Sequence, residues 1–104
     1  MMLVVAEPYY RSLETARRIT DLARELGIPD VRAVANKVCT EREAEAIEGF
    51  CAARGLELFA TIPYDEEVLG AELAAAAPLD YCCDGVAMRA IAALAERLAG
   101  TLPA

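Results

Sequence analysis

The sequence predicts a single α/β domain built on a three-stranded parallel sheet with flanking helices. Three short apolar-rich segments, residues 3–6, 31–35 and 56–62, are the strand candidates, because strands covered on both faces are typically continuous in apolar residues. Helical patterns separate them, and this alternation implies parallel pairing through right-handed crossovers. A chain of 104 residues has room for one core, so we expect one domain over residues 1–104 with a frayed tail at 101–104.

The segment after the first strand is expected to form a helix that begins near Ser12 and ends before Gly27. Ser12 is a suitable N-cap, and the helix dipole favours the carboxylate of Glu14 in a first turn. Gly27 occupies the place of a C′ glycine, and Pro29 prevents continuation. Apolar residues at helical spacing define the inward face: Leu13, Ala16, Ile19, Ala23 and Leu26.

A second helix is expected between the second and third strands. Thr40 and Glu43 match a capping box, and Gly55 is the expected stop. Its inward residues are expected to be Ala44, Ile47, Phe50 and Cys51. With the strands adjacent in chain order, the first two helices would lie on the same face of the sheet, and the last helix could cover the other face.

The last third of the chain is predicted to be helical. Asp65 can cap a short acidic helix over residues 66–75. Residues 81–85 are expected to form a loop, and residues 86–98 have apolar positions at helical spacing, with Gly100 as the stop.

Composition limits the partners. The formal net charge is −7, and the nine arginines and one lysine form no run, which argues against nucleic acid or an anionic membrane as a partner. No stretch of about 18 apolar residues predicts a membrane span, and the start lacks a basic n-region, so we expect a cytoplasmic protein. The hydrophobic content of 57% predicts an exposed apolar patch or a covering partner.

The chain contains no histidine, which excludes histidine-based triads and His/Cys zinc sites. In a cytosolic protein the four cysteines, Cys39, Cys51, Cys82 and Cys83, are expected to be reduced. Cys51 lies on an inward helix face and is interpreted as a small apolar core residue. Adjacent Cys82 and Cys83 would ligate one ion poorly, so no metal site is assigned; a site shared between two subunits is the alternative.

Three segments follow the predicted strands: Glu7–Tyr10, Asn36–Cys39 and Ile62–Asp65. In open parallel sheets, ligands bind beyond the carboxyl ends of the strands, so these segments are the candidate site. Asn36 and Lys37 taken alone are better explained as a simple strand-end turn. Tyr9 and Tyr10 could stack on a ligand or partner, or could cover the end of a strand.

In this order and spacing, these segments resemble the C-terminal half of MinD/ParA-like (SIMIBI) P-loop ATPases, and most closely the CooC-type carbon-monoxide-dehydrogenase accessory ATPases. The resemblance is carried by Val5–Pro8, Arg11–Ala16, Leu22–Gly27, Val34–Val38 and Ile62–Asp65. It is firm to about residue 75 and looser through the last helix. It implies half of a Rossmann-like P-loop NTPase domain.

The resemblance also implies an adenine site. In that family the asparagine after this strand contacts adenine, which corresponds to Asn36 with its neighbour Lys37, and the loop of Pro63, Tyr64 and Asp65 forms the second wall. An asparagine side chain offers one acceptor and two donors to a base edge. Guanine-specific relatives carry an aspartate two residues after the lysine, where this chain has Cys39, so guanine is disfavoured.

The sequence contains no phosphate loop of the form G-x-x-x-x-G-K-[ST], because the residue immediately before the single lysine is not a glycine. We therefore assign no catalytic residue and expect no enzymatic activity from this chain alone. No cofactor is assigned with certainty, and ATP or ADP would be bound only together with a P-loop-bearing partner. In the relatives, the magnesium-binding aspartate and a metal-binding cysteine pair belong to the P-loop half.

In the relatives, the strand that corresponds to Leu3, Val4, Val5 and Ala6 pairs with the P-loop strand. Without that neighbour it would be an exposed apolar edge, which favours pairing with another chain. The partner would be a second copy, giving a homodimer with a six-stranded sheet, or a separate P-loop-bearing chain. The leading hypothesis is thus a binding and assembly module, and the alternative is the C-terminal subunit of a split ATPase in metallocofactor (nickel) maturation.

Overall fold

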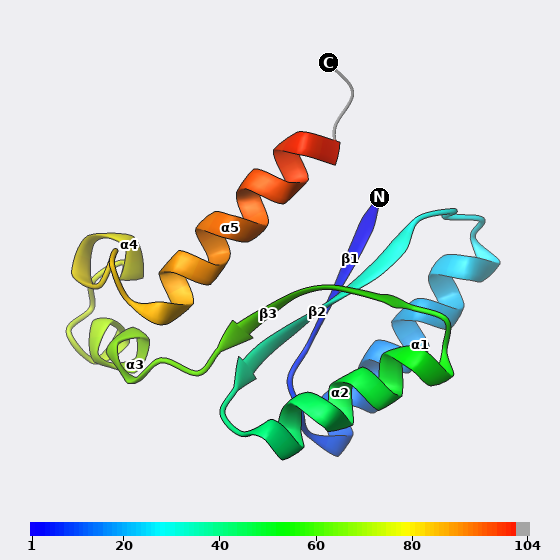
Figure 1. The fold of residues 1–104 in the computed structure, drawn as a ribbon, viewed down its shortest axis with the longest axis horizontal. Helices are drawn as coiled ribbons and strands as arrows, with labels where there is room; N and C mark the ends of the chain where they lie inside the picture. Colours follow the sequence, from blue (N-terminus) through cyan, green and yellow to red (C-terminus); the bar gives the residue numbers. More distant parts are fainter. Residues whose placement is uncertain (102–104) are drawn as a thin grey trace.

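The structure is a computed structural model that describes residues 1–101. Its elements in chain order are β1 (Met2–Ala6), α1 (Tyr10–Glu25), β2 (Val31–Val38), α2 (Glu41–Ala53), β3 (Glu57–Pro63), α3 (Glu66–Leu73), α4 (Pro78–Tyr81) and α5 (Val86–Thr101). The strands form one parallel sheet in the order β1-β2-β3. The predicted fold class is confirmed (Figure 1). No helix among residues 1–101 is both long and apolar enough to cross a membrane.

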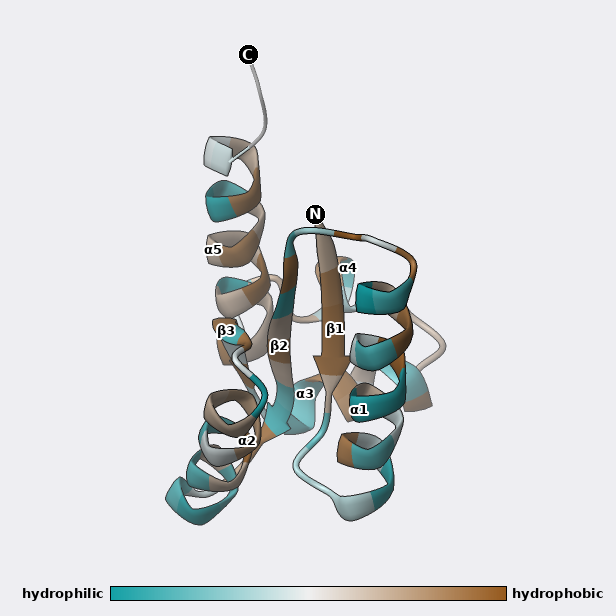
Figure 2. Ribbon diagram, turned by 90° about the vertical axis from the view of Figure 1, so that its right-hand side faces the viewer, coloured by the Kyte–Doolittle hydropathy of each residue, from teal (hydrophilic) through white to brown (hydrophobic). Residues whose placement is uncertain are grey.

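One face of the sheet is covered by α1 and α2, as expected. Val4 and Ala6 of β1 pack with Ala16 of α1, and a neighbouring cluster joins β2 to Ile47 and Cys51 of α2. The exposed sides of these helices are hydrophilic, whereas the strands are largely hydrophobic (Figure 2). This amphipathic pattern explains why the helices dock on the sheet.

The opposite face is covered by α5, chiefly over β3. Val34 of β2 and Ile62 of β3 form a buried cluster with Ala87 of α5, and Ala90 and Leu94 pack against this cluster from the next turns of the helix. The alternation of β2 residues between the two faces follows from the two-residue period of a strand. This packing places the start of α5 near the carboxyl ends of β2 and β3.

The start of α1 differs from the prediction. Tyr9 is the N-cap residue and provides no side-chain hydrogen bond, so the helix begins two residues before Ser12. The Ser12 hydroxyl instead accepts a hydrogen bond of 2.8 Å from the Glu7 amide and closes the turn after β1. The prediction that Leu26 faces inward is also wrong, because this residue is 71% exposed. Thr20 of the same helix is buried instead. The Thr20 hydroxyl can be buried because it donates to the Ala16 carbonyl.

Helix ends set by glycine were predicted correctly for α1 and α2. Gly27 and Gly55 have φ values of +79° and +64°, the left-handed conformation that glycine adopts without a steric penalty. The first bond of the capping box of α2 also forms, since the Glu43 amide donates to the Thr40 hydroxyl. The Glu43 carboxylate accepts a hydrogen bond from the Cys39 amide, one residue before the N-cap, in place of the Thr40 amide that the capping box predicts.

The C-terminal third contains one helix more than predicted. Residues 78–81 form the short helix α4, in which Pro78 occupies the first turn, where its missing N–H costs nothing. Helix α5 continues through Gly100 to Thr101, so Gly100 is not the stop. Of the predicted frayed tail, Thr101 lies in the last turn of α5, and residues 102–104 lie outside the described residues.

Candidate nucleotide-base site

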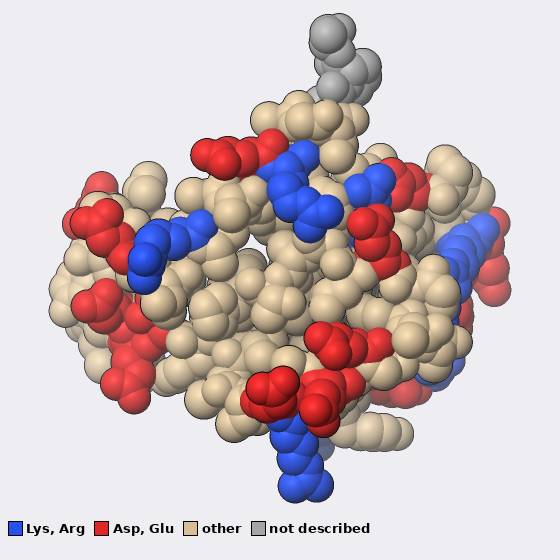
Figure 3. All heavy atoms as spheres, in the orientation of Figure 1, with Lys and Arg blue, Asp and Glu red and all other residues tan. Residues whose placement is uncertain are grey.

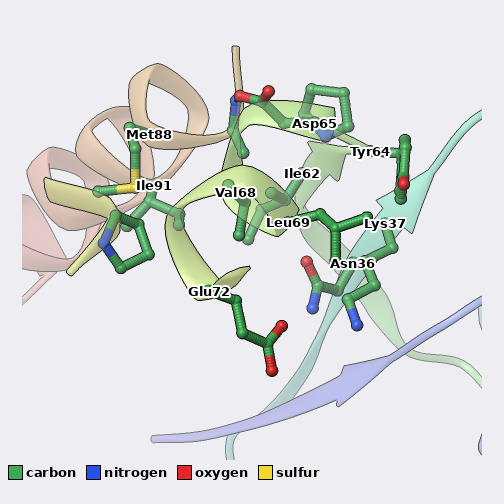
Figure 4. Close-up of a pocket in the computed structure, with 13 residues that line it drawn as sticks. Asn36, Lys37, Ile62, Tyr64, Asp65, Val68, Leu69, Glu72, Met88 and Ile91 are labelled. Carbon is green, nitrogen blue, oxygen red and sulfur yellow. The ribbon is translucent and has the colours of Figure 1, made fainter. Parts of the chain in front are cut away.

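A pocket of about 290 Å³ lies at the carboxyl ends of β2 and β3. All five residues of the predicted adenine site line it, although they come from two separate segments of the chain. The lining consists of Asn36, Lys37, Ile62, Pro63, Tyr64, Asp65, Val68, Leu69, Glu72, Pro78, Ala87, Met88 and Ile91 (Figure 4). The structure therefore brings the predicted residues together at one place.

A β-bulge presents Asn36 and Lys37 at the pocket. Ala35 pairs with Thr61 and Val38 pairs with Pro63, so two residues of β2 stand opposite one residue of β3. Lys37 has a φ of +56°, which is unusual for a residue with a side chain. β-bulges often redirect side chains near functional sites. Here Asn36 and Lys37 are both part of the pocket lining (Figure 4).

Lys37 forms an ion pair with Glu7 at the end of β1. The Lys37 Nζ lies 3.1 Å from the Glu7 Oε1, and their side chains are 58% and 34% exposed. The hydrogen bond to Glu7 and its charge raise the pKa of Lys37, with a smaller contribution from Glu72. The only lysine of the chain is therefore held by a carboxylate at the rim of the pocket.

Most of the remaining lining of the pocket is apolar and comes from α3 and α5. Val68 and Leu69 lie on α3, and Met88 and Ile91 lie on α5. Sequence reasoning did not assign these residues to the site. For Met88 and Ile91 the sequence contained one signal, the apolar residues at helical spacing in the last helix. Only the docking of α5 shows which of these apolar residues face the carboxyl ends of the strands. Glu72 of α3 was also missed.

Asp65 caps two helices. Its Oδ1 accepts a hydrogen bond of 2.9 Å from the Glu67 amide at the start of α3, as the sequence predicts. Its Oδ2 accepts a second bond of 3.2 Å from the Ala87 amide at the start of α5. The second bond joins residues 22 positions apart in the chain, so no local pattern could reveal it.

The other candidate residues lie outside this pocket. Tyr9 and Tyr10 are 56% and 80% exposed and do not line it. Cys39 and Cys83 are exposed, whereas Cys51 and Cys82 are buried. Burial raises the pKa of the Cys51 and Cys82 thiols, and for Cys82 the nearby acidic side chains add to the effect. Residues 1–101 contain no group of three or more potential metal ligands.

The predicted interface strand lies at an edge of the sheet. Val4 and Ala6 are buried against α1, and Leu3 packs beside the α5 cluster. Val5 points to the α5 face and is 59% exposed, because α5 lies over β3 and leaves this part of the sheet uncovered.

On the face shown in Figure 3, basic side chains are scattered and most lie beside acidic ones, so they form no basic patch there.

The chain is similar in sequence and in structure to several known proteins. The chain is 34% identical over 105 aligned positions to the carbon monoxide dehydrogenase accessory protein CooC of Rhodospirillum rubrum, and the match covers 97% of this chain. It is 40% identical over 72 residues to the uncharacterized ATP-binding protein MJ0823 of Methanocaldococcus jannaschii, covering 69% of this chain. The structure superposes on the MinD cell division protein of Aquifex aeolicus with a TM-score of 0.78 at 22% identity.

The chain is similar to a C-terminal part of MinD/CooC-like ATPases. It spans 28% of the length of MJ0823 and 38% of the length of CooC. The superposition covers 97% of this chain and 44% of the MinD chain, which shows that the fold is that of part of a MinD domain. No family model matches the sequence. The resemblance inferred from the sequence is thus confirmed.

Proposed function

We propose that this chain provides the base-binding side of an adenine-nucleotide site and acts as a binding and assembly module. The observation that carries the proposal is the convergence of Asn36, Lys37 and the loop of Pro63, Tyr64 and Asp65 on one pocket. Asn36 would read the base edge with its amide, and the apolar wall would contact the ring. The similarity to a protein named as ATP-binding supports adenine as the base.

The phosphates would be bound by a P-loop outside these 104 residues. Lys37 is already paired with Glu7, and the pocket lining adds the acidic residues Asp65 and Glu72, which do not favour phosphate. In nucleotide sites of this kind, phosphate and magnesium contacts supply much of the interaction. This chain alone would therefore bind a nucleotide no more tightly than about 1 mM.

The open edge of β1 is the proposed docking place for the P-loop-bearing partner. A strand added parallel to β1 would end at the same side of the sheet as the pocket, beside Glu7 and Lys37. Such a partner would also cover Val5, which is exposed near the carboxyl end of β1. The second occupant to consider is another copy of this chain, paired antiparallel through β1 in a homodimer with a six-stranded sheet.

A second candidate function is a role as the C-terminal subunit of a split ATPase in metallocofactor maturation, with nickel as the cargo. It is favoured by the similarity to CooC, whose match covers 97% of this chain. Metal-handling residues would then come from the partner, since residues 1–101 contain no cluster of potential ligands. ATP hydrolysis that requires both chains would support this function.

Calorimetric titration tests the nucleotide site. The isolated chain should show no saturation by ATP, ADP or GTP below about 1 mM, and its complex with a P-loop chain should bind ATP in preference to GTP. Asn36→Ala should weaken ATP binding by about tenfold, because the base loses its hydrogen-bonding partner. Thr61→Ala, on β3 outside the pocket, is the control. Micromolar binding by the isolated chain, or unchanged binding by Asn36→Ala, would overturn the proposal.

Sedimentation equilibrium tests the edge of β1. A mass of about 22 kDa for the isolated chain, twice its 11.1 kDa, would indicate the homodimer. Addition of a P-loop chain should give a mixed complex if β1 receives that partner. Val5→Lys should abolish either assembly, because a charge on an edge strand opposes pairing. Leu22→Lys, at a similarly exposed position on α1, should not. A mass of one chain under both conditions would refute docking at β1.

A further inference from the structure

Asp65 occupies a position between the starts of two helices that are distant in the sequence. Its two carboxylate oxygens accept hydrogen bonds from different helices, Oδ1 from the Glu67 amide and Oδ2 from the Ala87 amide. Carboxylates are favoured at helix N-termini, because the first amides have no partner within the helix. One side chain thus ties both α3 and α5 to the end of β3.

The loop before α5 closes tightly around this carboxylate. A Cβ atom at Gly85 would lie 2.6 Å from the Asp65 Oδ2 and 3.1 Å from the Cys82 carbonyl oxygen. The Gly85 amide donates to that same carbonyl at 3.0 Å. Glycine is therefore needed at position 85 so that the backbone can approach Asp65, a requirement unrelated to the turn conformation.

The two helices held by Asp65 provide most of the apolar wall of the pocket. Val68 and Leu69 follow the capped start of α3, and Met88 and Ile91 follow the capped start of α5. Ala87 is the one buried residue among the described residues of α5. The hold of α5 on the sheet near the pocket therefore depends on its first turn.

The far end of α5 has a separate anchor. Arg97 donates a hydrogen bond to the Phe59 carbonyl, and its guanidinium lies 4.1 Å from the centre of the Phe59 ring. Phe59 lies in β3, away from the pocket lining. Loss of the Asp65 bond to Ala87 would thus release the first turn of α5 while the other end stays attached.

We propose that Asp65 is a positioning residue of the base pocket, which clamps α3 and α5 in the arrangement that forms its apolar wall, and is not a contact to the base. Each oxygen accepts a hydrogen bond from a backbone amide, and these two bonds fix the carboxylate between the starts of the two helices. This inference deepens the proposed function and rests on it for the nature of the ligand. The clamp itself can be measured without any nucleotide.

Amide hydrogen exchange of the isolated chain, followed by NMR, tests the clamp. Asp65→Asn keeps one acceptor oxygen but replaces the other with an N–H₂ donor, so protection of either Glu67 or Ala87 should fall by about tenfold. Asp65→Ala should lower the protection of both, whereas Asp84→Asn, the same charge change in the loop before α5, should lower neither. The Ile47 amide in the core of the same samples reports whether each variant is folded. Unchanged protection of Ala87 and Glu67 in folded Asp65→Ala would overturn the proposal.

A nucleotide titration of the complex with a P-loop chain tests whether the clamp matters for binding. Gly85→Ala displaces the Asp65 Oδ2 from the Ala87 amide, so the clamp predicts weaker ATP binding by about tenfold, and unchanged binding would contradict a positioning role. Gly49→Ala on α2 is the control, because a Cβ there meets nothing within 4 Å. If the wild-type complex binds no nucleotide, the proposed function fails, and the exchange experiment still decides the clamp.

Discussion

The Nζ of Lys37 lies 3.1 Å from the Oε1 of Glu7, which joins the carboxyl ends of β2 and β1 at the rim of the pocket. Lys37 holds this position in a left-handed conformation, with a φ of +56°. A non-glycine residue with positive φ is uncommon and frequently marks a functional site. Lys37 therefore carries both the ion pair and the left-handed conformation of the bulge, and it lies next to Asn36.

The left-handed conformation of Lys37 can be tested by substitution. Lys37→Gly and Lys37→Ala both remove the ion pair, but only glycine adopts a positive φ without a steric penalty. The glycine variant should therefore be more stable than the alanine variant by about 1 kcal/mol. Urea denaturation of both variants provides the comparison. Equal stability, or a more stable alanine variant, would show that residue 37 is not left-handed in solution.

The ion pair also predicts a pH dependence. Pairing with Glu7 raises the pKa of Lys37 above its ordinary value of 10.5. Its contribution to stability is therefore fully present below pH 10.5 and is lost as the pH rises through the raised pKa. The difference in Tm between the wild type and Glu7→Gln should be constant from pH 8 to pH 10.5 and should shrink as the pH rises further through the raised pKa. A difference that does not shrink above pH 10.5 would contradict a stabilising pair.

Two glycines should respond to alanine in opposite directions. Gly85→Ala should destabilise the protein by about 1–3 kcal/mol, because the new Cβ overlaps the Asp65 Oδ2 and forces the loop to move. Gly49→Ala should stabilise it by about 0.5–1 kcal/mol, because it replaces a helix-interior glycine in open space. Thermal unfolding of both variants measures these two changes in stability. A stable Gly85→Ala protein would mean that the loop does not pack against Asp65 as described.

The four thiols should fall into two classes of reactivity. Cys39 and Cys83 are exposed, whereas Cys51 and Cys82 are buried and have raised pKa values, which keep them in the less reactive protonated form. Brief treatment with iodoacetamide at pH 8 should therefore modify two sites in the native protein, and all four in urea. Peptide mass spectrometry identifies the sites. Native labelling of Cys82 as fast as Cys83 would contradict the packing of the loop before α5.

Local signals predicted much of the fold. Thr40 and Asp65 cap the helices that follow them, and Gly27 and Gly55 end the preceding ones, because each signal acts within a few residues. The prediction failed where a contact outside the helix decided the outcome. Ser12 has the chemistry of an N-cap, but its hydroxyl bonds back to the Glu7 amide, so α1 begins earlier.

The candidate site was predictable in part for the same reason. Asn36 lies in the last part of β2 and Asp65 follows β3, and strands that run parallel carry their carboxyl ends to one side of the sheet. The contributions of Met88 and Ile91 could not be predicted, because the apolar stripe of α5 is compatible with several docking angles. Likewise, the sequence gives no sign that Lys37 is left-handed.

The sequence by itself determined the order of the elements from β1 to α3, the parallel sheet and the residues of the strand ends at its carboxyl edge, since these depend on hydrophobic period, caps and chain direction. The tertiary structure decided how that edge is closed. Asp65 reaches Ala87 across 22 positions, and Lys37 reaches Glu7 from a different strand. Contacts of this kind arise only when separate elements pack together, so the shape of the pocket belongs to the fold and not to any one segment.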